Sequence, residues 1–403
     1  MIRTAYIVDV VRTPGGRRNG TLSQWHPADL GAQVINALIE RNKLDGKLVD
    51  DVIFGCVSQV GAQAANVARG AVLASNLPIS VPATTVDRQC GSSQQAIHFA
   101  AQAVMSGTQD IVIAGGVEIM SLVPLGANAV AGMKEGHGQP MSDIHMKKYP
   151  SEADQPTFSQ FKGAELVAQE FKTSRKEMEE FALESHKRAA AATDSGKFKN
   201  EIIPVKGKDP KTGAEVLVSE DAGIRRDISL AAMAKLKTLD PEGVITAAVA
   251  SQVTDGASAC LIMNEEGLRK TGLKPRARIV SLALAGDDPV VMLRAIIPAS
   301  KKALEQVNLK PEDIDLYEIN EAFASVPLAM MKALKIPHSK VNVHGGAIAL
   351  GHPLGATGVK LMATLLNALE QRGGRYGLLT MCEGGGMANA TIIERLATTK
   401  SQL

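Results

Sequence analysis

Apolar and polar residues alternate along this chain with two different periods. Short β-branched runs predict strands at 5–10, 52–57, 82–86 and 110–114, the last ending at Gly115 and Gly116. Segments with apolar residues at helical spacing predict helices at 29–38, 66–73 and 96–105. Strands that alternate with helices in this way predict an α/β fold whose sheet is covered on both faces.

The pattern changes between residues 121 and 253, where the chain becomes charged and irregular. One amphipathic helix is predicted here, with Ser174 as its N-cap, Glu177 completing a capping box, and apolar positions up to Ala192. We expect 121–253 to be an inserted loop domain that carries binding residues and subunit contacts.

Regular α/β patterning resumes at 257–263, and the last third repeats the first in outline. The repeated elements are predicted strands at 315–319 and 376–381 and a predicted helix at 359–370. The sequence therefore predicts two similar α/β halves. One comprises 1–120 and is completed by 254–275, and the other comprises 276–403, with the insertion attached to the first.

Composition narrows the class of protein. At 403 residues, the chain is long enough for more than one core, and a net charge of +2 gives no reason to expect a nucleic-acid or membrane partner. The N-terminus enters a predicted strand without a signal-peptide pattern, which favours a cytoplasmic location. The cysteines lack metal-type spacing, so neither a metal site nor a disulfide framework is expected. They are Cys56, Cys90, Cys260 and Cys382.

The segment Val86–Ala96 gives the strongest indication of chemistry. Cys90 follows a predicted strand and precedes a predicted helix, whose positive end favours a thiolate over a thiol. Gly91 leaves space beside the sulfur for an attack on a substrate. Polar neighbours on both sides argue against a buried structural cysteine, whereas Cys56 and Cys260 lie in apolar strands and are expected in the core.

Three further segments concentrate polar side chains and glycines. Glu318–Ala324 follows a predicted strand, at the position where open sheets bind ligands. Val343–Gly358 is a glycine-rich loop that lacks the dinucleotide and P-loop patterns, and its His352 could be structural or functional. Cys382–Met387 places a second cysteine beside three glycines, whose backbone amides are unhindered.

Together these segments resemble the thiolase family of acetyl-CoA acyltransferases. The matching motifs occur in the family's order at Asp87–Ala96, Asn320–Phe323, Gly345–Pro353 and Cys382–Gly386, supported by Thr246–Ser251 and Ile297–Ser300. The two cysteine segments are most similar to a branch tied to the breakdown of steroid or other unusual acyl chains. The resemblance covers nearly the whole chain and implies a five-layered αβαβα fold with an inserted loop domain.

The resemblance also implies the catalytic residues. Cys90 would attack the keto carbon of a 3-ketoacyl-CoA, His352 would take its proton, and Cys382 would protonate the departing acetyl-CoA carbanion. One oxyanion hole would combine His352 with a water held by Asn320. The second would use the backbone amides of Cys90 and Gly384.

The binding residues that the resemblance implies are Arg225, Ser251, Met292 and Phe323, which would contact coenzyme A or line its tunnel. Coenzyme A would be a substrate, and no tightly bound cofactor or metal is expected. The expected partners are acyl-CoA, CoA and further copies of the chain in a homotetramer or a dimer.

The chain departs from the family pattern in ways that concern substrate choice. Gln160–Gly163 stands where the family often has His-x-Met-Gly, His344 replaces an asparagine, and Ala232 replaces a serine near the adenine site. The change at Gln160–Lys162, together with the resemblance of the two cysteine segments to the steroid-linked branch, favours 3-ketoacyl-CoAs larger than acetoacetyl-CoA. Alternatively, Phe161 fills the space of the missing methionine and leaves an acetoacetyl-sized pocket.

Thiolytic degradation is the function that the sequence favours, and a biosynthetic acetyl-CoA acetyltransferase is the main alternative. A cysteine hydrolase built on Cys90 and His352 would not explain Cys382 beside three glycines. A non-catalytic acyl-CoA carrier would need no second cysteine. A ketosynthase-type enzyme would be expected to use two histidines with its cysteine.

Overall fold

A mixed sheet organises the fold, which we describe from a computed structural model for residues 3–150 and 158–396. Its strand order is β10-β11-β12-β9-β1-β8-β5-β3-β4, and β2 pairs with β8. The strands of this sheet are β1 Tyr6–Arg12, β2 Gly16–Arg17, β3 Asp51–Gly55, β4 Ala83–Val86, β5 Ile111–Ile119, β8 Thr254–Met263, β9 Ala277–Gly286, β10 Leu316–Ile319, β11 Tyr376–Glu383 and β12 Met387–Arg395. A separate hairpin pairs β6 Val205–Lys208 with β7 Glu215–Val218.

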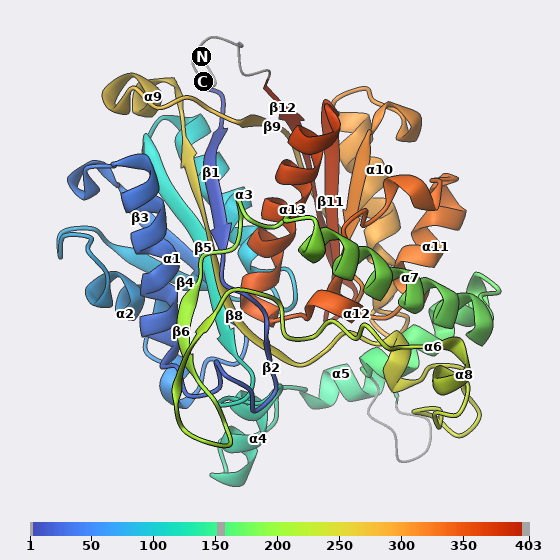
Figure 1. Cartoon of the computed structure of the whole chain (residues 1–403). Helices are drawn as coiled ribbons and strands as arrows, with labels where there is room; N and C mark the ends of the chain where they lie inside the picture. Colours follow the sequence, from blue (N-terminus) through green and yellow to red (C-terminus); the bar gives the residue numbers. More distant parts are fainter. Residues whose placement is uncertain (1–2, 151–157, 397–403) are drawn as a thin grey trace.

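Helices cover both faces of the sheet and also lie between its two halves (Figure 1). They are α1 Pro27–Asn42, α2 Val67–Ala74, α3 Ser92–Ser106, α4 Ala127–Lys134, α5 Asp143–Lys148, α6 Gln160–Glu170, α7 Arg175–Asp194, α8 Leu230–Met233, α9 Glu265–Thr271, α10 Ile296–Gln306, α11 Ser325–Leu334, α12 Ala347–Leu350 and α13 Thr357–Arg372.

Three apolar clusters define five layers. The central cluster contains Ile97 of α3 and Leu365 of α13, which pack against strands from both halves of the sheet. A second cluster packs α1 and α2 on the outer face of β3 and β5, and a third packs α10 and α11 on the outer face of β10 and β11. The predicted αβαβα order of layers is therefore confirmed. The two half-sheets meet where β1 pairs briefly with β9, at Tyr6↔Arg278 and Ile7↔Ala277.

The predicted internal repeat is visible in the strand pairing. β3 pairs in parallel with β5, and β10 pairs in parallel with β11. α3 and α13 occupy the shared middle layer at equivalent points of the two halves. After the insertion, β8 returns to the first half, where it lies between β1 and β5.

The predicted end of the strand at 110–114 is wrong. The strand expected to stop at Gly115 and Gly116 continues as β5 to Ile119. These glycines are interior residues of the strand because a neighbouring loop presses against it. A Cβ at Gly116 would collide with the carbonyl oxygen of Gly355, so only glycine allows this close approach.

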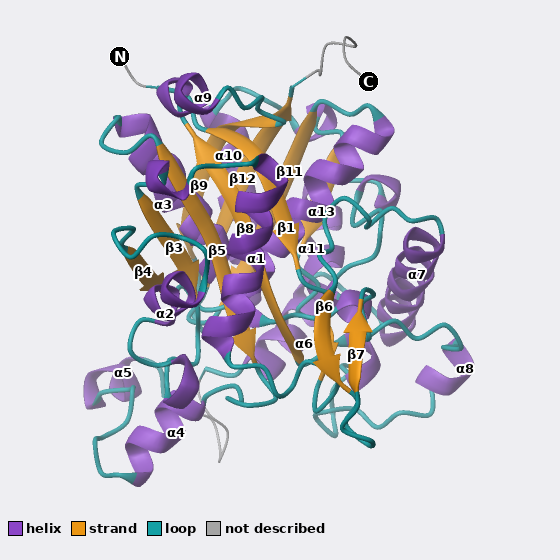
Figure 2. Ribbon diagram, turned by 60° about the vertical axis from the view of Figure 1, so that its left-hand side comes forward, coloured by secondary structure: helices purple, strands orange, loops and turns teal. Residues whose placement is uncertain are grey.

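The insertion contains more regular structure than its irregular sequence predicts. α7 begins after Ser174 with the predicted capping box, in which Glu177 bonds back to the Ser174 amide at 2.8 Å. α6 begins after Ser159 and buries Gly163, Ala164, Val167 and Ala168, one apolar face at helical spacing. α4 and α5 extend away from the sheet (Figure 2). Among the described residues, no helix is long and apolar enough to cross a membrane.

Candidate active site

Cys90 lies in a tight turn between β4 and α3, as the sequence predicts. Gln89 has a φ of +47°, and the Ser92 hydroxyl donates to the Gln89 carbonyl at 2.6 Å while accepting from the Arg88 amide at 2.9 Å. Gly91 is the N-cap of α3. These bonds fix the turn and hold Cys90 just outside the first turn of the helix.

The environment of Cys90 corrects the expectation of a thiolate. The side chain is partly buried and packs against a small apolar cluster formed by Val57, Met120 and Leu354. Burial, together with the nearby carboxylate of Glu383, raises the pKa of Cys90 to about 12. Loss of hydration therefore outweighs the helix N-terminus, and Cys90 is a neutral thiol near pH 7. Such a nucleophile needs a base.

His352 is held in one orientation by its neighbours. Its Nδ1 lies 2.6 Å from the Thr357 hydroxyl, which itself donates to the Pro353 carbonyl at 3.0 Å. Because a hydroxyl has only one proton to donate, Nδ1 carries the imidazole proton and donates to Thr357. Nε2 is therefore the unprotonated nitrogen, and it lies 3.5 Å from Nδ2 of Asn320. Burial, aided by the charge of Lys360, lowers the pKa of His352 to about 3, so the resting ring is neutral.

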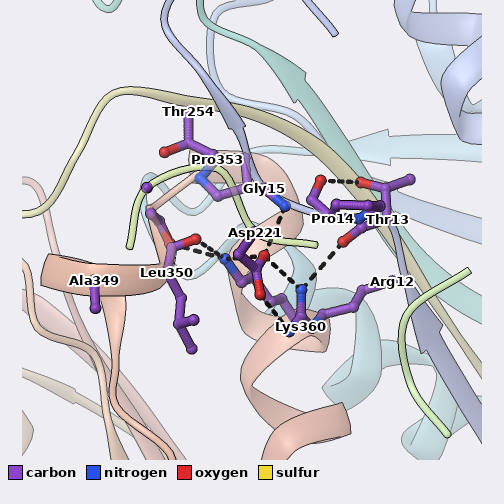
Figure 3. A network of polar contacts seen from close by, with 12 residues as sticks. Arg12, Thr13, Pro14, Gly15, Asp221, Thr254, Ala349, Leu350, Pro353 and Lys360 are labelled. Atoms are coloured by element: carbon purple, nitrogen blue, oxygen red, sulfur yellow. Dashed lines mark hydrogen bonds and ion pairs between the residues drawn. The ribbon is translucent and has the colours of Figure 1, made fainter. Parts of the chain in front are cut away.

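The loop that carries His352 is held by a buried charged residue. Nζ of Lys360, on α13, donates to the carbonyl oxygens of Leu350 and Gly351, the two residues before His352 (Figure 3). The His352 amide in turn donates to the Thr254 hydroxyl at 3.2 Å. A Cβ at Gly351 would collide with that hydroxyl, so the glycine at φ +81° is needed here.

An ion network extends from Lys360 into the core. Asp221 lies 3.9 Å from Lys360 and accepts two bonds from Arg12, at 2.8 and 2.9 Å (Figure 3). Arg12 also pairs with Glu201 at 2.7 Å, and the Gly15 amide donates to Asp221 at 2.7 Å. The side chains of Arg12, Asp221 and Glu201 are fully buried. Removing one partner of such a network leaves an uncompensated buried charge, so the network fixes the loop firmly.

The helix that follows Cys90, α3, and the helix that follows the His352 loop, α13, meet at their first turns. The Ser93 hydroxyl accepts from the Val359 amide at 3.2 Å, and a Cβ at Gly358 would collide with the Gln94 amide nitrogen. Leu354, two residues after His352, contacts the same cluster as Cys90. The two predicted catalytic residues are thus brought to one place.

Cys382 and Gly384 lie near the turn that carries Cys90. Cys382 is buried near the end of β11, and burial together with the proximity of Cys90 raises its pKa well above the ordinary value. β11 turns into β12 through Gly384–Gly386, with Glu383 paired to Met387. The Cβ position of Gly384 is 3.0 Å from Oε1 of Gln89, so its backbone lies beside the turn that carries Cys90.

Asn320 follows β10 at the predicted sheet edge. It is fully buried, and its amide donates to the Thr380 carbonyl at 3.1 Å. Its Nδ2 points to His352, whereas its Oδ1 has no hydrogen-bond partner among the described residues. A buried acceptor of this kind is a natural position for an ordered water.

Two of the four predicted coenzyme A residues belong to one apolar cluster, and a third bonds to the residue before Phe323. Met292 and Phe323 are buried in one apolar cluster, and the Ser251 amide donates to the Ala322 carbonyl at 2.9 Å. Arg225 is exposed in a loop, where its amide donates to Nδ1 of His186 at 3.1 Å. The Gly223 carbonyl of the same loop accepts from Gln252, the residue after Ser251, at 2.9 Å.

The departures from the family pattern also have defined positions. Phe161 is 49% exposed and lies edge-on to Phe323, with ring centroids 5.7 Å apart. His344 is buried with its ring edge toward Phe198, at 5.9 Å. Ala232 is exposed in the short helix α8. Cys56 and Cys260 are fully buried, which confirms their predicted place in the core.

Sequence reasoning missed three residues of this site, which are Thr357, Lys360 and Glu383. Lys360 is a single charge within the apolar run Val359–Leu366, and Glu383 ends the apolar strand β11. A charge in an apolar segment is a signal that could have identified both. Within the described residues, no group of three or more His, Cys, Asp or Glu is placed to hold a metal.

Comparison with known proteins decides the family. The family model described as "Thiolase, N-terminal domain" matches residues 5–266, and "Thiolase, C-terminal domain" matches residues 273–395. The chain belongs to the thiolase family. It is therefore an acyltransferase, as the sequence motifs predict.

Relatives of this thiolase come from several bacteria. The steroid 3-ketoacyl-CoA thiolase FadA6 of Mycobacterium tuberculosis is 50% identical, over 97% of this chain and 94% of that protein. The 3-ketoacyl-CoA thiolase of Marinobacter nauticus is 44% identical, over 98% and 99%. The crystal structure of the Bacillus anthracis acetyl-CoA acetyltransferase superposes with a TM-score of 0.88 at 36% identity, covering 98% of this chain and 99% of that one. This likeness confirms the thiolase fold.

Proposed function

We propose that this thiolase cleaves a 3-ketoacyl-CoA with coenzyme A, giving acetyl-CoA and a shortened acyl-CoA through an acyl-enzyme on Cys90. The observation that carries the proposal is the tautomer of His352. Thr357 fixes the protonated Nδ1, so the unprotonated Nε2 faces Asn320. The loop that carries His352 packs against the Cys90 turn.

In the first half-reaction, the Cys90 thiol passes its proton to Nε2 of His352 as its sulfur attacks the keto carbon. The bond between the α-carbon and the keto carbon then breaks. Cys382 protonates the acetyl-CoA carbanion that leaves, and an acyl thioester remains on Cys90.

In the second half-reaction, coenzyme A gives its thiol proton to the Cys382 thiolate and attacks the thioester. The acyl group leaves as acyl-CoA, and imidazolium His352 returns the proton to Cys90. Both cysteines and the histidine thus regain their starting protonation states, so the cycle needs no external acid or base.

Two oxyanion holes would stabilise the charge that develops on oxygen. The first would consist of Nε2 of His352, in its protonated form, and a water held by the unpartnered Oδ1 of Asn320. The second would consist of the amides of Cys90 and Gly384, which lie on adjoining turns. One such donor contributes about 3 kcal/mol of transition-state stabilisation.

We propose further that the preferred substrates are larger than acetoacetyl-CoA. Phe161 remains half-exposed at the edge of Phe323 instead of filling an interior space. A cavity of about 410 Å³ lies beside it, lined in part by Leu239 and Ile245. This volume is within the range of small-molecule sites. The similarity to a steroid 3-ketoacyl-CoA thiolase supports a bulky acyl group.

A biosynthetic acetyl-CoA acetyltransferase is the second candidate, favoured by the structural likeness to the Bacillus anthracis enzyme. The test is kcat/KM for thiolysis of acetoacetyl-CoA and of medium-chain, branched and cyclic 3-ketoacyl-CoAs. One fitted methylene changes specificity by roughly 10–200-fold, so an open pocket should favour a larger substrate by at least tenfold. If acetoacetyl-CoA is preferred by more than about tenfold, the large-substrate proposal is refuted.

The remaining expectations belong to the same proposal. Arg225, Ser251, Met292 and Phe323 would bind coenzyme A, which acts as a substrate. A homotetramer or a dimer in the cytoplasm would be the working form, and the division at 120/121, 253/254 and 275/276 stays a prediction. Size-exclusion chromatography with light scattering would determine the oligomeric state.

A further inference from the structure

A buried glutamate lies between the turn that carries Cys90 and the strand that carries Cys382. Glu383 is the last residue of β11 and directly follows Cys382. Side chains alternate along β11, with Leu378 in the outer cluster and Leu379 in the central one. Glu383 therefore extends toward the middle layer, where α3 begins.

The carboxyl group occupies the space beside Gly91. A Cβ at Gly91 would collide with Oε1 of Glu383 and would lie 2.8 Å from its Cδ and from Nδ2 of Asn389. Asn389, on β12, donates from that nitrogen to the Gly91 carbonyl at 3.1 Å. Glu383 and Asn389 thus support the residue that follows the nucleophile.

The carboxyl group of Glu383 has no hydrogen-bond partner in the part of the chain that the structure describes. The residue is fully buried, and both of its carboxyl oxygens lack a partner. A buried, unpaired carboxylate is strongly disfavoured relative to the uncharged acid. Burial accordingly raises the pKa of Glu383 to about 8.

The charged and titratable groups around Glu383 come from the turn before α3, from α3 itself, from β11 and from β5. Arg88 and Asp87, in the turn before α3, act in opposite directions, since Arg88 favours the carboxylate and Asp87 disfavours it. Arg88 is itself near His98 of α3, whose pKa it helps to lower. Cys90, in the turn, and Cys382, the preceding residue of β11, are both close enough to Glu383 that its charge would raise the pKa of each. Glu118 of β5 adds a smaller effect of the same sign on Cys90.

We propose that Glu383 is a positioning residue of the nucleophile turn that works as an uncharged carboxylic acid, and that its ionisation in alkaline solution slows the acylation of Cys90. The uncharged acid fills the space beside Gly91 without opposing the negative charge that forms on the attacking sulfur. The carboxylate would oppose that charge at short range. This role rests on the proposed function of Cys90 as the acylated residue.

Glu383→Gln tests the role because glutamine has the same shape and stays uncharged at every pH. The measurement is the rate of Cys90 alkylation by iodoacetamide between pH 6.5 and 10, followed by mass spectrometry of the Cys90 peptide. At pH 9, the variant should react at least about threefold faster than the wild type, which corresponds to a Cys90 pKa lower by about half a unit. At pH 6.5, where Glu383 is protonated, the two rates should agree.

Glu318→Gln is the matched control. Glu318 is a second buried glutamate with an unpartnered oxygen, on β10. The pH profile of Cys90 alkylation in Glu318→Gln should match that of the wild type. A Glu383→Gln profile identical to the wild type, or an equal change in Glu318→Gln, would overturn the proposal.

A second measurement covers the case in which Glu383→Gln does not fold. Because other buried glutamates such as Glu318 can also be protonated, infrared spectra are compared for the wild type and Glu318→Gln. Both should contain a protonated-carboxyl component at pH 7 that disappears as the pH rises through about 8. Its absence at pH 7 would overturn the proposal. Alkylation needs no substrate, so an intact alkylation difference without acyl transfer from any 3-ketoacyl-CoA would refute the proposed function alone.

Discussion

The hydroxyl of Thr357 lies 2.6 Å from Nδ1 of His352 and fixes which nitrogen of the imidazole is free. Thr357 uses its own proton on the Pro353 carbonyl, so it can only accept from the ring. The acceptor nitrogen Nε2 is thereby directed toward Asn320. Thr357, the first residue of α13, thus determines which nitrogen of the proposed base carries the proton.

Thr357→Val should slow acylation because it removes this acceptor while keeping the shape of the side chain. We expect kcat to fall by about 10- to 100-fold with KM little changed, as for other partners that orient a functional histidine. Stopped-flow measurement of acyl-enzyme formation checks this. Thr357→Ser keeps the hydroxyl and should stay near the wild-type rate. Equal losses in both variants would show that packing, not the hydrogen bond, is what matters.

Lys360→Met should destabilise the fold and loosen the His352 loop. The substitution removes the donor to the Leu350 and Gly351 carbonyls and leaves Asp221 with less compensation. Breaking a buried pair costs about 3–5 kcal/mol of the free energy of unfolding. Denaturant titration measures the free energy of unfolding of Lys360→Met. The control is Lys301→Met, on the exposed face of α10. A loss below about 1 kcal/mol would show that the network does not anchor the loop.

Stability should depend on pH through Glu383. Its folded-state pKa, about 8, is above the ordinary value of 4.5, so the folded state holds a proton that the unfolded state has lost between these pH values. The contribution of Glu383 to the free energy of unfolding is fully present below pH 4.5 and declines as the pH rises toward 8. The free energy of unfolding of Glu383→Gln, relative to the wild type, should therefore increase from pH 5 to pH 8. Exposed Glu305→Gln should show no such trend, and a flat difference for Glu383→Gln would contradict the assignment.

Cys382 and His352 should affect different steps. Cys382→Ser should abolish carbon–carbon bond chemistry but leave partial acyl transfer to Cys90 from a simple acyl-CoA, because that transfer needs no proton at the α-carbon. His352→Ala should slow the acylation itself, since the neutral Cys90 thiol then lacks its base. Single-turnover assays with acetyl-CoA and with a 3-ketoacyl-CoA separate the two steps. The same loss of acylation in both variants would mean that the roles are shared.

The sequence predicts those parts of the fold that depend on local pattern. The strand–turn–helix around Cys90 and the capping box of α7 follow from adjacent residues, and both are confirmed. The end of β5 does not follow from adjacent residues. Gly116 resembles a strand terminator, and the residue that it contacts, Gly355, is distant in sequence. Tertiary contact overrides the local signal there.

In the candidate site, too, local sequence predicts some features and tertiary packing determines the others. Cys90, His352 and Cys382 stand in recognisable motifs, so their types and order indicate the chemistry. The protonation of Cys90 could not be predicted, because it depends on how deeply the turn is buried and on a carboxyl group 293 positions away in the chain. The helix terminus, visible in the sequence, favours a thiolate, whereas desolvation, which only the packing determines, favours the thiol.

The most direct test of the account is to identify the residue that carries the acyl group. The enzyme is mixed with a 3-ketoacyl-CoA or an acyl-CoA, quenched in acid, digested and analysed by mass spectrometry. We predict that the acyl mass increment lies on the peptide that contains Cys90, and that it disappears in Cys90→Ser. An increment found instead on Cys382, Cys56 or Cys260 would contradict the account.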